Sequence, residues 1–471
     1  MTSHRIVSIA FLVAAIDIAS VLCSCAVADQ LYVGGATVSI TPNGPVALAG
    51  QRHLRIARKV ESPITATALA IEARDGDQVT DHVVFVSCDL VAIREGVPEM
   101  LRAKLKGKLA GLEPQKIVLS ATHTHTAPVT TEQKYTIPKE GVIQPEQYTQ
   151  FLIDRLSDAV TQAWNARQPV RVGWGLGHAV VAMSRLPVYH DGTSRMYGPT
   201  NRQDFQRFEG YEDHGIEILC FWNQQDKLIA TAVNIACPSQ EVGGSTYISA
   251  DFWHPVRQML RERHGEDLII VPWTGASGGQ TSRLLFRKAA EERMRKLRGV
   301  SALEDIAGRI VAGWEEAYQG ASKDKRDDVP LAHHVETIAL PVRQVTEVEA
   351  DAARKRVAAL ADNPAKRWDV LWDQRVVDRF ENQKPDDVYP MELHVVRLGD
   401  VAIATNAFEL YTDYGVQMKQ RSPALQTFVV QLAGPGSYLP TERAVAGGAY
   451  GAVPQSNKVG PIENCAGKGP R

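Results

Sequence analysis

Short apolar runs alternate with longer amphipathic segments along most of the chain. Helical periodicity predicts helices from Met100 to Leu109 and from Tyr148 to Trp164. Each leads into an apolar, β-branched run that predicts a strand, the first beginning at Ile117 and the second running from Val170 to Gly175. Regular alternation of helix and strand is typical of α/β proteins.

The same alternation continues in the middle of the chain. Apolar segments from Ile216 to Trp222 and from Leu228 to Ala236 predict a hairpin, because a short polar stretch separates them. A helix from Phe252 to Arg263 and a buried strand from Leu268 to Pro272 follow.

Later segments add charged helices and one further strand pair. Amphipathic patterns predict helices between Phe286 and Gln319 and from Val348 to Ala361, and Leu393 to Val396 pairs with Val401 to Ala404 around Gly399-Asp400. We therefore predict an α/β fold, with a mixed β-sheet core and flanking helices.

Composition is that of an ordinary globular protein. The 471 residues are 44% hydrophobic and 23% charged, and a net charge of −2 gives no reason to expect nucleic acid as a partner. Cys88, Cys220, Cys237 and Cys465 are too few for a disulfide framework, although one bridge stays open. No linker, low-complexity tract or repeat interrupts the chain, so we expect residues 29–471 to form one domain.

Residues 1–28 have the pattern of an export signal. Ile6 to Leu22 is apolar apart from one aspartate, and Ala26-Val27-Ala28 is an A-x-A cleavage site. The run is short and charged for a single-span anchor. We expect a periplasmic or secreted protein, and LCSC, ending at Cys25, resembles a bacterial lipobox loosely enough to leave a lipid-anchored form open.

The segment KIVLSATHTHTAPV, Lys116 to Val129, carries the strongest candidate chemistry. A buried strand there breaks into a polar stretch with His123 and His125. In an extended segment, rings two residues apart project to opposite sides, so we expect one to bind a metal and the other to face substrate or a supporting group. The simpler alternative is a pair of buried histidines satisfied by hydrogen bonds.

The residues around the two histidines read S-x-T-H-T-H-T-A-P from Ser120 to Pro128. They resemble the signature of the neutral (non-lysosomal) ceramidases. These are zinc-dependent amidases that hydrolyse the N-acyl bond of ceramide. Similarity at other positions runs from about Val33 to Pro461, and implies the ceramidase catalytic domain without the C-terminal immunoglobulin-like domain of well-known members.

The resemblance implies three zinc ligands in this chain. They are His123, Glu409 in NAFELYTDYG, and Tyr450 in a Y-x-G-A-like context before Gly451-Ala452. On residue type alone, Glu409 is equally well a solvated cap and Tyr450 part of a surface loop. We expect Tyr438 to serve in packing.

The resemblance also implies catalytic roles for His125, Thr281 and Arg185. His125 would stabilise an oxyanion or transfer a proton, and Arg185, in Met183-Ser184-Arg185, would orient the substrate. In the Gly-rich stretch from Trp273 to Arg283, the family's G-D-x-S-P becomes G-G-Q-T-S, so Thr281 stands in place of the serine and Ser282 is a possible substitute.

One family ligand has no counterpart. A second zinc-binding histidine lies in an N-x-x-x-H context in ceramidases, whereas this chain has no histidine after Asn234. The fourth ligand stays open among five residues of suitable type: Cys237, Gln240, Glu241, His53 and His254.

These features favour a zinc-dependent amidohydrolase, with Zn²⁺ as cofactor, that cleaves a ceramide-like lipid or related amide. A lipid substrate predicts an apolar trough leading to His123 and contact with a membrane surface, and no partner protein is expected. The alternative is an exported, non-catalytic binding protein on the same scaffold. A metal-free hydrolase using Ser282 or Thr281 ranks third, because no G-x-S-x-G motif presents a nucleophile.

Overall fold

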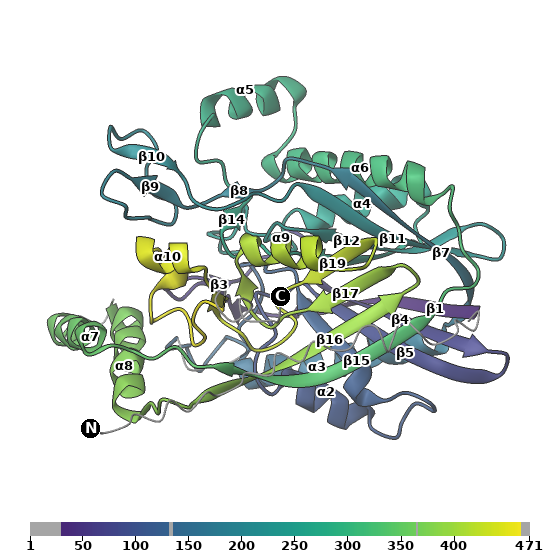
Figure 1. Ribbon diagram of the computed structural model, residues 1–471, viewed down its shortest axis with the longest axis horizontal. Coiled ribbons are helices and arrows are strands. Elements are labelled where there is room, and N and C mark those ends of the chain that lie inside the picture. The colour runs from purple at the N-terminus through teal and green to yellow at the C-terminus, as the bar shows by residue number, and fades with distance from the viewer. Residues whose placement is uncertain (1–29, 131–134, 364–365, 463–471) are drawn as a thin grey trace, which may run out of the picture.

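The computed structural model describes residues 30–130, 135–363 and 366–462 (Figure 1). The export signal predicted for residues 1–28 and Cys465 lie outside the described residues. The other three cysteines beyond the signal, Cys88, Cys220 and Cys237, are buried free thiols.

An eight-stranded sheet forms the centre of the molecule. Its strand order is β13-β12-β11-β7-β1-β4-β5-β6, and the β5/β6 and β12/β13 pairs are parallel while the other pairs are antiparallel. In chain order, the strands are β1 (Gln30–Ser39), β4 (Thr65–Asp75), β5 (Gln78–Cys88), β6 (Ile117–Ala121), β7 (Gln168–His178), β11 (Gly215–Asn223), β12 (Leu228–Ile235) and β13 (Ile269–Thr274). The sheet is therefore mixed, as expected.

Helices cover one face of this sheet in two groups. The long helix α3 (Pro145–Asn165) packs with α2 (Val97–Leu105) over β1 and β4, and α6 (Ala302–Ala321) packs with α4 (Trp253–His264) over β7 and β11. Close approach requires glycine at the contact: a Cβ on Gly177 of β7 would lie 2.0 Å from the carbonyl oxygen of Gly313 in α6.

A second, four-stranded sheet covers the opposite face. Its order is β15-β16-β17-β19, with bounds β15 (Leu331–Pro341), β16 (Val388–Leu398), β17 (Val401–Thr405) and β19 (Gln426–Val430). Apolar side chains from both sheets form one buried cluster, in which Trp273 of β13 contacts Phe85 of β5 and Phe428 of β19 edge to face. Burial of this shared cluster holds the two sheets together.

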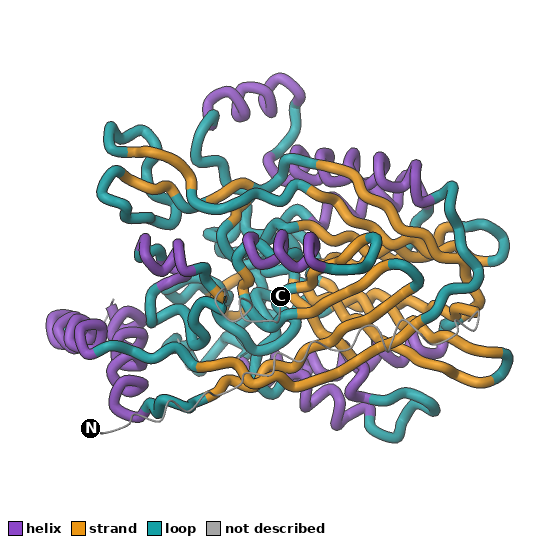
Figure 2. Tube along the Cα trace, viewed as in Figure 1, coloured by secondary structure: helices purple, strands orange, loops and turns teal. Residues whose placement is uncertain are grey.

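Smaller elements surround the two sheets (Figure 2). The remaining strands are β2 (Val46–Ala47), β3 (Ile56–Ala57), β8 (Met183–Ser184), β9 (Pro187–Tyr189), β10 (Phe205–Phe208), β14 (Gln280–Thr281), β18 (Glu409–Leu410) and β20 (Tyr438–Leu439). The remaining helices are α5 (Lys288–Arg298), α7 (Glu347–Leu360), α8 (Arg367–Asn382), α9 (Thr412–Arg421) and α10 (Glu442–Gly447), with 3-10 turns η1 (Pro114–Lys116) and η3 (Tyr450–Ala452). No helix within the described ranges has the length and apolar character needed to span a bilayer.

The predicted fold class is confirmed, with a mixed sheet and flanking helices in three layers (Figure 1). The elements expected from the sequence are present with shifts of a few residues at their ends; the helix predicted from Met100, for example, begins at Val97 as α2. The sequence analysis did not identify β15 or α8.

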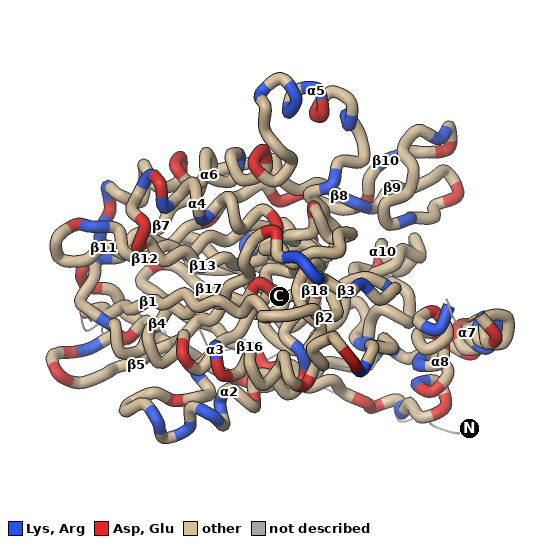
Figure 3. The backbone as a smooth tube through the Cα atoms, turned by 180° about the vertical axis from the view of Figure 1, so that it is seen from behind, with Lys and Arg blue, Asp and Glu red and all other residues tan. Residues whose placement is uncertain are grey.

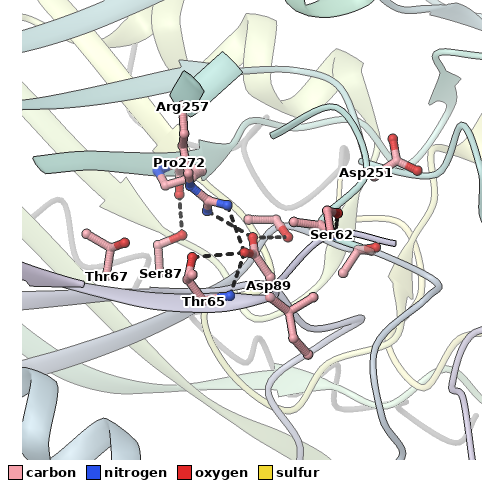
Figure 4. A network of polar contacts seen from close by, with 12 residues as sticks. Ser62, Thr65, Thr67, Ser87, Asp89, Asp251, Arg257 and Pro272 are labelled. Atoms are coloured by element: carbon pink, nitrogen blue, oxygen red, sulfur yellow. Dashed lines mark hydrogen bonds and ion pairs between the residues drawn. The ribbon is translucent and has the colours of Figure 1, made fainter. Parts of the chain in front are cut away.

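A buried ion pair fastens the end of β5 to α4 (Figure 4). Both guanidinium nitrogens of Arg257 bind the Asp89 carboxylate, at 2.8 and 3.0 Å, and neither side chain is more than 6% exposed. The hydroxyl groups of Thr65 and Thr122 donate to the same carboxylate. Asp89 therefore connects Thr65, at the start of β4, to Thr122, which directly precedes His123.

A chain of imidazoles links the two sheets near their edge. His333 of β15 lies with its Nδ1 3.2 Å from the carbonyl oxygen of His82 in β5, and its Nε2 3.0 Å from Nδ1 of His394 in β16. The other ring nitrogen of His394 lies 2.8 Å from Glu392, which also binds Arg102 of α2. Polar contacts thus continue across an otherwise apolar interface.

Candidate functional site

His123 and His125 lie just beyond the end of β6 and face one another. Their Nε2 atoms are 3.3 Å apart and the ring planes are 72° apart, edge to face. The expectation that the two rings project to opposite sides is wrong. His123 adopts a left-handed backbone conformation, with φ of 67°, which breaks the extended alternation and turns both imidazoles to one side.

The hydrogen bond that His123 Nδ1 donates determines whether its other ring nitrogen, Nε2, can bind a cation. Nδ1 lies 2.6 Å from the carbonyl oxygen of Val91, which can only accept, so Nδ1 carries a hydrogen. In the neutral ring, Nε2 then presents a lone pair. That lone pair faces His125 Nε2 at 3.3 Å and a Glu409 carboxylate oxygen at 3.4 Å. Electron-rich atoms at these distances require a proton or a cation between them.

Glu409 reaches His123 from the far end of the sequence. It begins β18, which pairs in parallel with β20 so that Glu409 lies beside Tyr438. Burial alone would raise the pKa of this carboxyl group, but the neighbouring His123 and Arg185 and a hydrogen bond from Tyr438 lower it to about 2. Glu409 is therefore an anion at neutral pH.

Arg185 is the only cation that contacts the Glu409 carboxylate among the described residues, at 4.0 Å, and its side chain is 2% exposed. Its guanidinium donates to the carbonyl oxygen of Gly278 at 2.9 Å and contacts the hydroxyl groups of Tyr438 and Tyr197 at 3.2 and 3.3 Å. Burial opposes the charge on Arg185, but the two tyrosines and Glu409 raise its pKa overall.

Two tyrosines thus belong to the site, although the sequence analysis predicted a site role for neither. Tyr438 packs in a buried cluster, as expected, and its hydroxyl group also contacts Arg185 and Glu409. Tyr197 has a left-handed backbone, with φ of 58°, and no motif surrounds it. Burial alone would raise the pKa of Tyr197, but Arg185 and a hydrogen bond with Thr281 lower it. Only the fold brings these hydroxyl groups together.

Backbone packs closely around His125. A Cβ on Gly50, whose φ is 93°, would lie 2.5 Å from Cγ of the His125 ring. Gly243 approaches from a second segment, and the guanidinium of Arg55 binds the carbonyl oxygens of both His125 and Gly243. Burial and the neighbouring His123 lower the pKa of His125 well below its usual value, so its ring is neutral.

Thr281 is buried in β14, which pairs with β8 and so lies next to Arg185. Its hydroxyl oxygen is 3.4 Å from the hydroxyl group of Tyr197, and accepts from the backbone N–H of Arg283. Ser282, the possible substitute, instead donates to Glu241 at 2.8 Å. The structure therefore connects Thr281, rather than Ser282, to the Arg185 network.

Tyr450 lies at the opening of the site, in η3. Its ring packs edge to face on Tyr438, with 5.8 Å between centroids, and stacks with Trp372 of α8 at 5.3 Å. The guanidinium of Arg52 lies over both the Trp372 and Tyr450 rings. Burial and the charge of Glu409 raise the pKa of Tyr450, so the phenol is neutral here.

The five candidates for a fourth ligand occupy different surroundings. The thiol of Cys237 is fully buried in an apolar cluster beside the carbonyl oxygen of Val181, and burial raises its pKa well above the usual value. His53 is exposed, and His254 lies on α4 next to Arg257. Gln240 adjoins Tyr197 at 3.5 Å and is the candidate in contact with the Arg185 network.

No group of three or more His, Cys, Asp or Glu side chains in the described part of the chain meets the requirements of a ready metal site. The spacing around His123 still fits zinc, because ligand atoms bound tetrahedrally at 2.0–2.1 Å lie about 3.3 to 3.4 Å apart. Nε2 of His123 has these separations from His125 and from Glu409. The hydroxyl group of Tyr438 hydrogen-bonds Glu409, and the ring of Tyr450 packs on Tyr438.

Comparison with solved structures identifies the fold. The neutral ceramidase from Pseudomonas aeruginosa superposes with a TM-score of 0.65 and 16% identity, covering 92% of this chain and 72% of the ceramidase. A ceramidase complexed with C2 gives the same TM-score and identity, with 92% and 73% covered. No protein-family model and no curated protein matches the sequence.

The chain therefore has the fold of a neutral ceramidase, as the sequence resemblance implied. At 16% identity, this likeness concerns the fold alone.

Proposed function

We propose that this protein is a zinc-dependent amidohydrolase that cleaves the N-acyl bond of a ceramide-like lipid or a related amide. One observation carries the proposal: the Nε2 lone pair of His123 faces a second imidazole and a carboxylate at 3.3 and 3.4 Å. A divalent cation between His123 and Glu409 would satisfy both the imidazole lone pair and the carboxylate, and imidazole with carboxylate is a common donor set of hydrolytic zinc.

In this proposal, His123 and Glu409 hold the metal, with Tyr450 as an oxygen donor that the metal would ionise, and the fourth ligand stays open. The fixed hydrogen bond from His123 Nδ1 to Val91 orients the imidazole, as supporting groups do in zinc sites. The chemistry that bound zinc supplies in such a site is a hydroxide nucleophile at neutral pH.

The remaining groups act on the substrate. A neutral His125 can accept a proton and return it to the leaving amine, which is the role expected from the sequence. Arg185 and Tyr197 present N–H and O–H donors next to Thr281, where they would bind the carbonyl oxygen of the amide. Arg185 would also hold Glu409 in its ionised form.

The cavity beside Tyr450 bears on the substrate. Its volume is about 530 Å³, and its walls combine the rings of Trp372 and Tyr450 with charged side chains, including Arg52 and Asp369. Of the predicted metal ligands only Tyr450 lines this cavity, so the apolar trough leading to His123 stays a prediction. Because charged side chains stand beside Tyr450, we favour an amide with a polar substituent next to its acyl chain.

Metal analysis tests the proposal most directly. Purified protein would be loaded with zinc, desalted and measured by elemental analysis, with His123→Ala and an exposed control, His334→Ala, prepared identically. We expect near-stoichiometric zinc in the wild type and the control, and loss of zinc in His123→Ala. N-acyl amides with and without polar substituents would then be assayed with the same three proteins.

A protein that takes up no zinc would remove the metallohydrolase proposal, and leave the non-catalytic binding protein in its place. Zinc bound equally by His123→Ala would place the metal elsewhere. Export to the periplasm or beyond belongs to the same proposal and depends on the sequence of residues 1–28; fractionation of the native host would test it.

A further inference from the structure

Helix α5 (Lys288–Arg298) stands away from the body of the protein at the end of an arm (Figure 1). It contains no buried residue, and only Glu291 and Arg295 are partly covered. A small cavity lined by residues of α5, α6 and the loop at Ser282 lies beneath it. Because α5 contributes nothing to any core, its sequence is free of packing constraints.

The side of α5 that faces the protein is charged. Glu291 binds Arg309 of α6 at 2.7 Å, and Arg298 binds Asp305 of α6 at 2.5 Å. Glu291, Arg295 and Arg298 share one stripe, since positions three and four apart lie together on a helix. Ion pairs therefore hold the arm against α6.

The neighbouring stripe, formed by Ala290, Met294 and Leu297, is apolar and open to solvent. Met294 is 45% exposed and Leu297 is 64% exposed. An amphipathic helix on a globular protein normally turns its apolar stripe inward. In α5 this arrangement is reversed, which indicates that the apolar stripe has a partner outside the chain.

Aromatic side chains extend this surface towards β10. Phe286, just before α5, is 37% exposed and its ring centroid lies 5.5 Å from that of Phe208. Phe208 in turn contacts Phe205, at the other end of the same strand. Apolar groups thus run from α5 onto the β9–β10 hairpin.

The charge around the apolar stripe is strongly positive. The segment from Arg287 to Arg298 carries six basic and two acidic residues, whereas the whole chain has a net charge of −2 (Figure 3). Arg293 and Lys288 have no carboxylate partner among the described residues. Exposed cations beside exposed apolar side chains are the pattern of a helix that lies in the interface of an anionic membrane.

We propose that α5, with Phe286, docks this protein onto an anionic lipid surface. Met294, Leu297 and Phe286 would enter the headgroup region while Lys288 and Arg293 bind anionic headgroups. A nucleic acid would satisfy the cations but would not bury the apolar stripe. Only Arg283 to Leu285 separate Phe286 from Ser282, next to Thr281, so docking would bring the candidate site close to the membrane.

Co-sedimentation with lipid vesicles tests this inference independently of any enzymatic activity. Vesicles of phosphatidylcholine with 30% phosphatidylglycerol would be compared with pure phosphatidylcholine, at low and at high salt. We expect binding to the anionic vesicles only, weakened by salt because counterions screen the headgroup attraction.

Three variants complete the test. Reversal of two cations, Lys288→Glu with Arg293→Glu, should weaken binding by at least about tenfold, since each cation contributes roughly fivefold. Met294→Ser with Leu297→Ser should weaken it at unchanged charge. Leu425→Ser, at a residue 72% exposed on the loop before β19, is the matched control and should bind like the wild type.

Far-UV circular dichroism would establish that each variant is folded. The inference is overturned if the wild type does not bind anionic vesicles at low salt, if it binds neutral vesicles equally well, or if folded variants of α5 bind like the wild type. Binding that depends on the cations but not on Met294 and Leu297 would point to simple electrostatic adsorption, and would also overturn membrane insertion.

Discussion

Acid should destabilise this protein through His333, buried between the two sheets. Burial, together with the adjacent His394, lowers the pKa of His333 to about 4 from its ordinary value of 6.5. The unfolded chain therefore takes up this proton at higher pH than the folded chain does. The contribution of neutral His333 to the free energy of unfolding is fully present above about pH 6.5. It is lost as the pH falls from about 6.5 to about 4.

The size of the effect follows from the shift. A difference of about 2.5 pKa units corresponds to about 3 kcal/mol over the full range, because each unit is worth a little more than 1 kcal/mol. Between pH 7 and pH 4.5, the loss of unfolding free energy from His333 alone should be about 2 kcal/mol. Other buried groups, including His82, titrate as well, so the contribution of His333 appears only as a difference between proteins.

The variant His333→Gln isolates that difference. Its amide oxygen can accept the hydrogen bond from His394, but the side chain does not titrate. Urea unfolding, followed by tryptophan fluorescence at pH 7 and pH 4.5, should show a pH-dependent loss about 2 kcal/mol smaller in His333→Gln than in the wild type. His334→Gln, at an exposed site on the same strand, is the control. Equal pH dependence in His333→Gln and wild type would refute the argument.

Three further substitutions test the structure around the site. Asp89→Asn should lower the free energy of unfolding by about 3–5 kcal/mol in urea titrations, because it leaves buried Arg257 without its anion. Gly50→Ala should lower thermal stability and, in zinc-loaded protein, metal content, since its Cβ would lie 2.5 Å from Cγ of His125. Tyr438→Phe removes a hydroxyl group that contacts Arg185, and should reduce kcat/KM for the amide substrate by about ten- to a hundredfold, with zinc content unchanged.

Each of these has an exposed counterpart. Asp267→Asn, whose side chain is 89% exposed, should leave urea stability unchanged. Gly244→Ala has nothing within 4 Å of the added Cβ, and should match the wild type in stability and zinc. Tyr211→Phe, at a residue 61% exposed, should keep full activity. A test substitution that behaved like its counterpart would contradict the contact assigned to it.

Hydrophobic patterning was sufficient to predict β6, β7, β11, β12 and β13 of the main sheet and the helices that cover it, because most of those segments bury a continuous apolar face. It did not predict β1, β4 and β5. The β11–β12 hairpin and the β16–β17 pair appear where the pattern placed them. Strand β15 was not predicted because polar residues, including His333, recur along it. Helix α8 was not predicted because charged residues interrupt its hydrophobic pattern and only a few of its residues are buried.

Only those residues of the candidate site that lie in short sequence motifs could be predicted. The motifs pointed to His123, Arg185 and Glu409, and the fold brings these three side chains together. The relative direction of the two imidazoles was mispredicted because it depends on one backbone angle at His123. Tyr438 enters the site through the register of β18 with β20, which no local pattern specifies.

The parallel pairing of β18 with β20 has a consequence for folding kinetics. His123 follows β6, whereas Glu409 and Tyr438 come from a pair of two-residue strands near the other end of the chain. The contact between His123 and Glu409 closes a very long loop, and contacts between residues far apart in the sequence form late in folding. A growing chain would complete the eight-stranded sheet before Glu409 is available. The contact between His123 and Glu409 would then form as one of the last events, after most of the polypeptide has been synthesised.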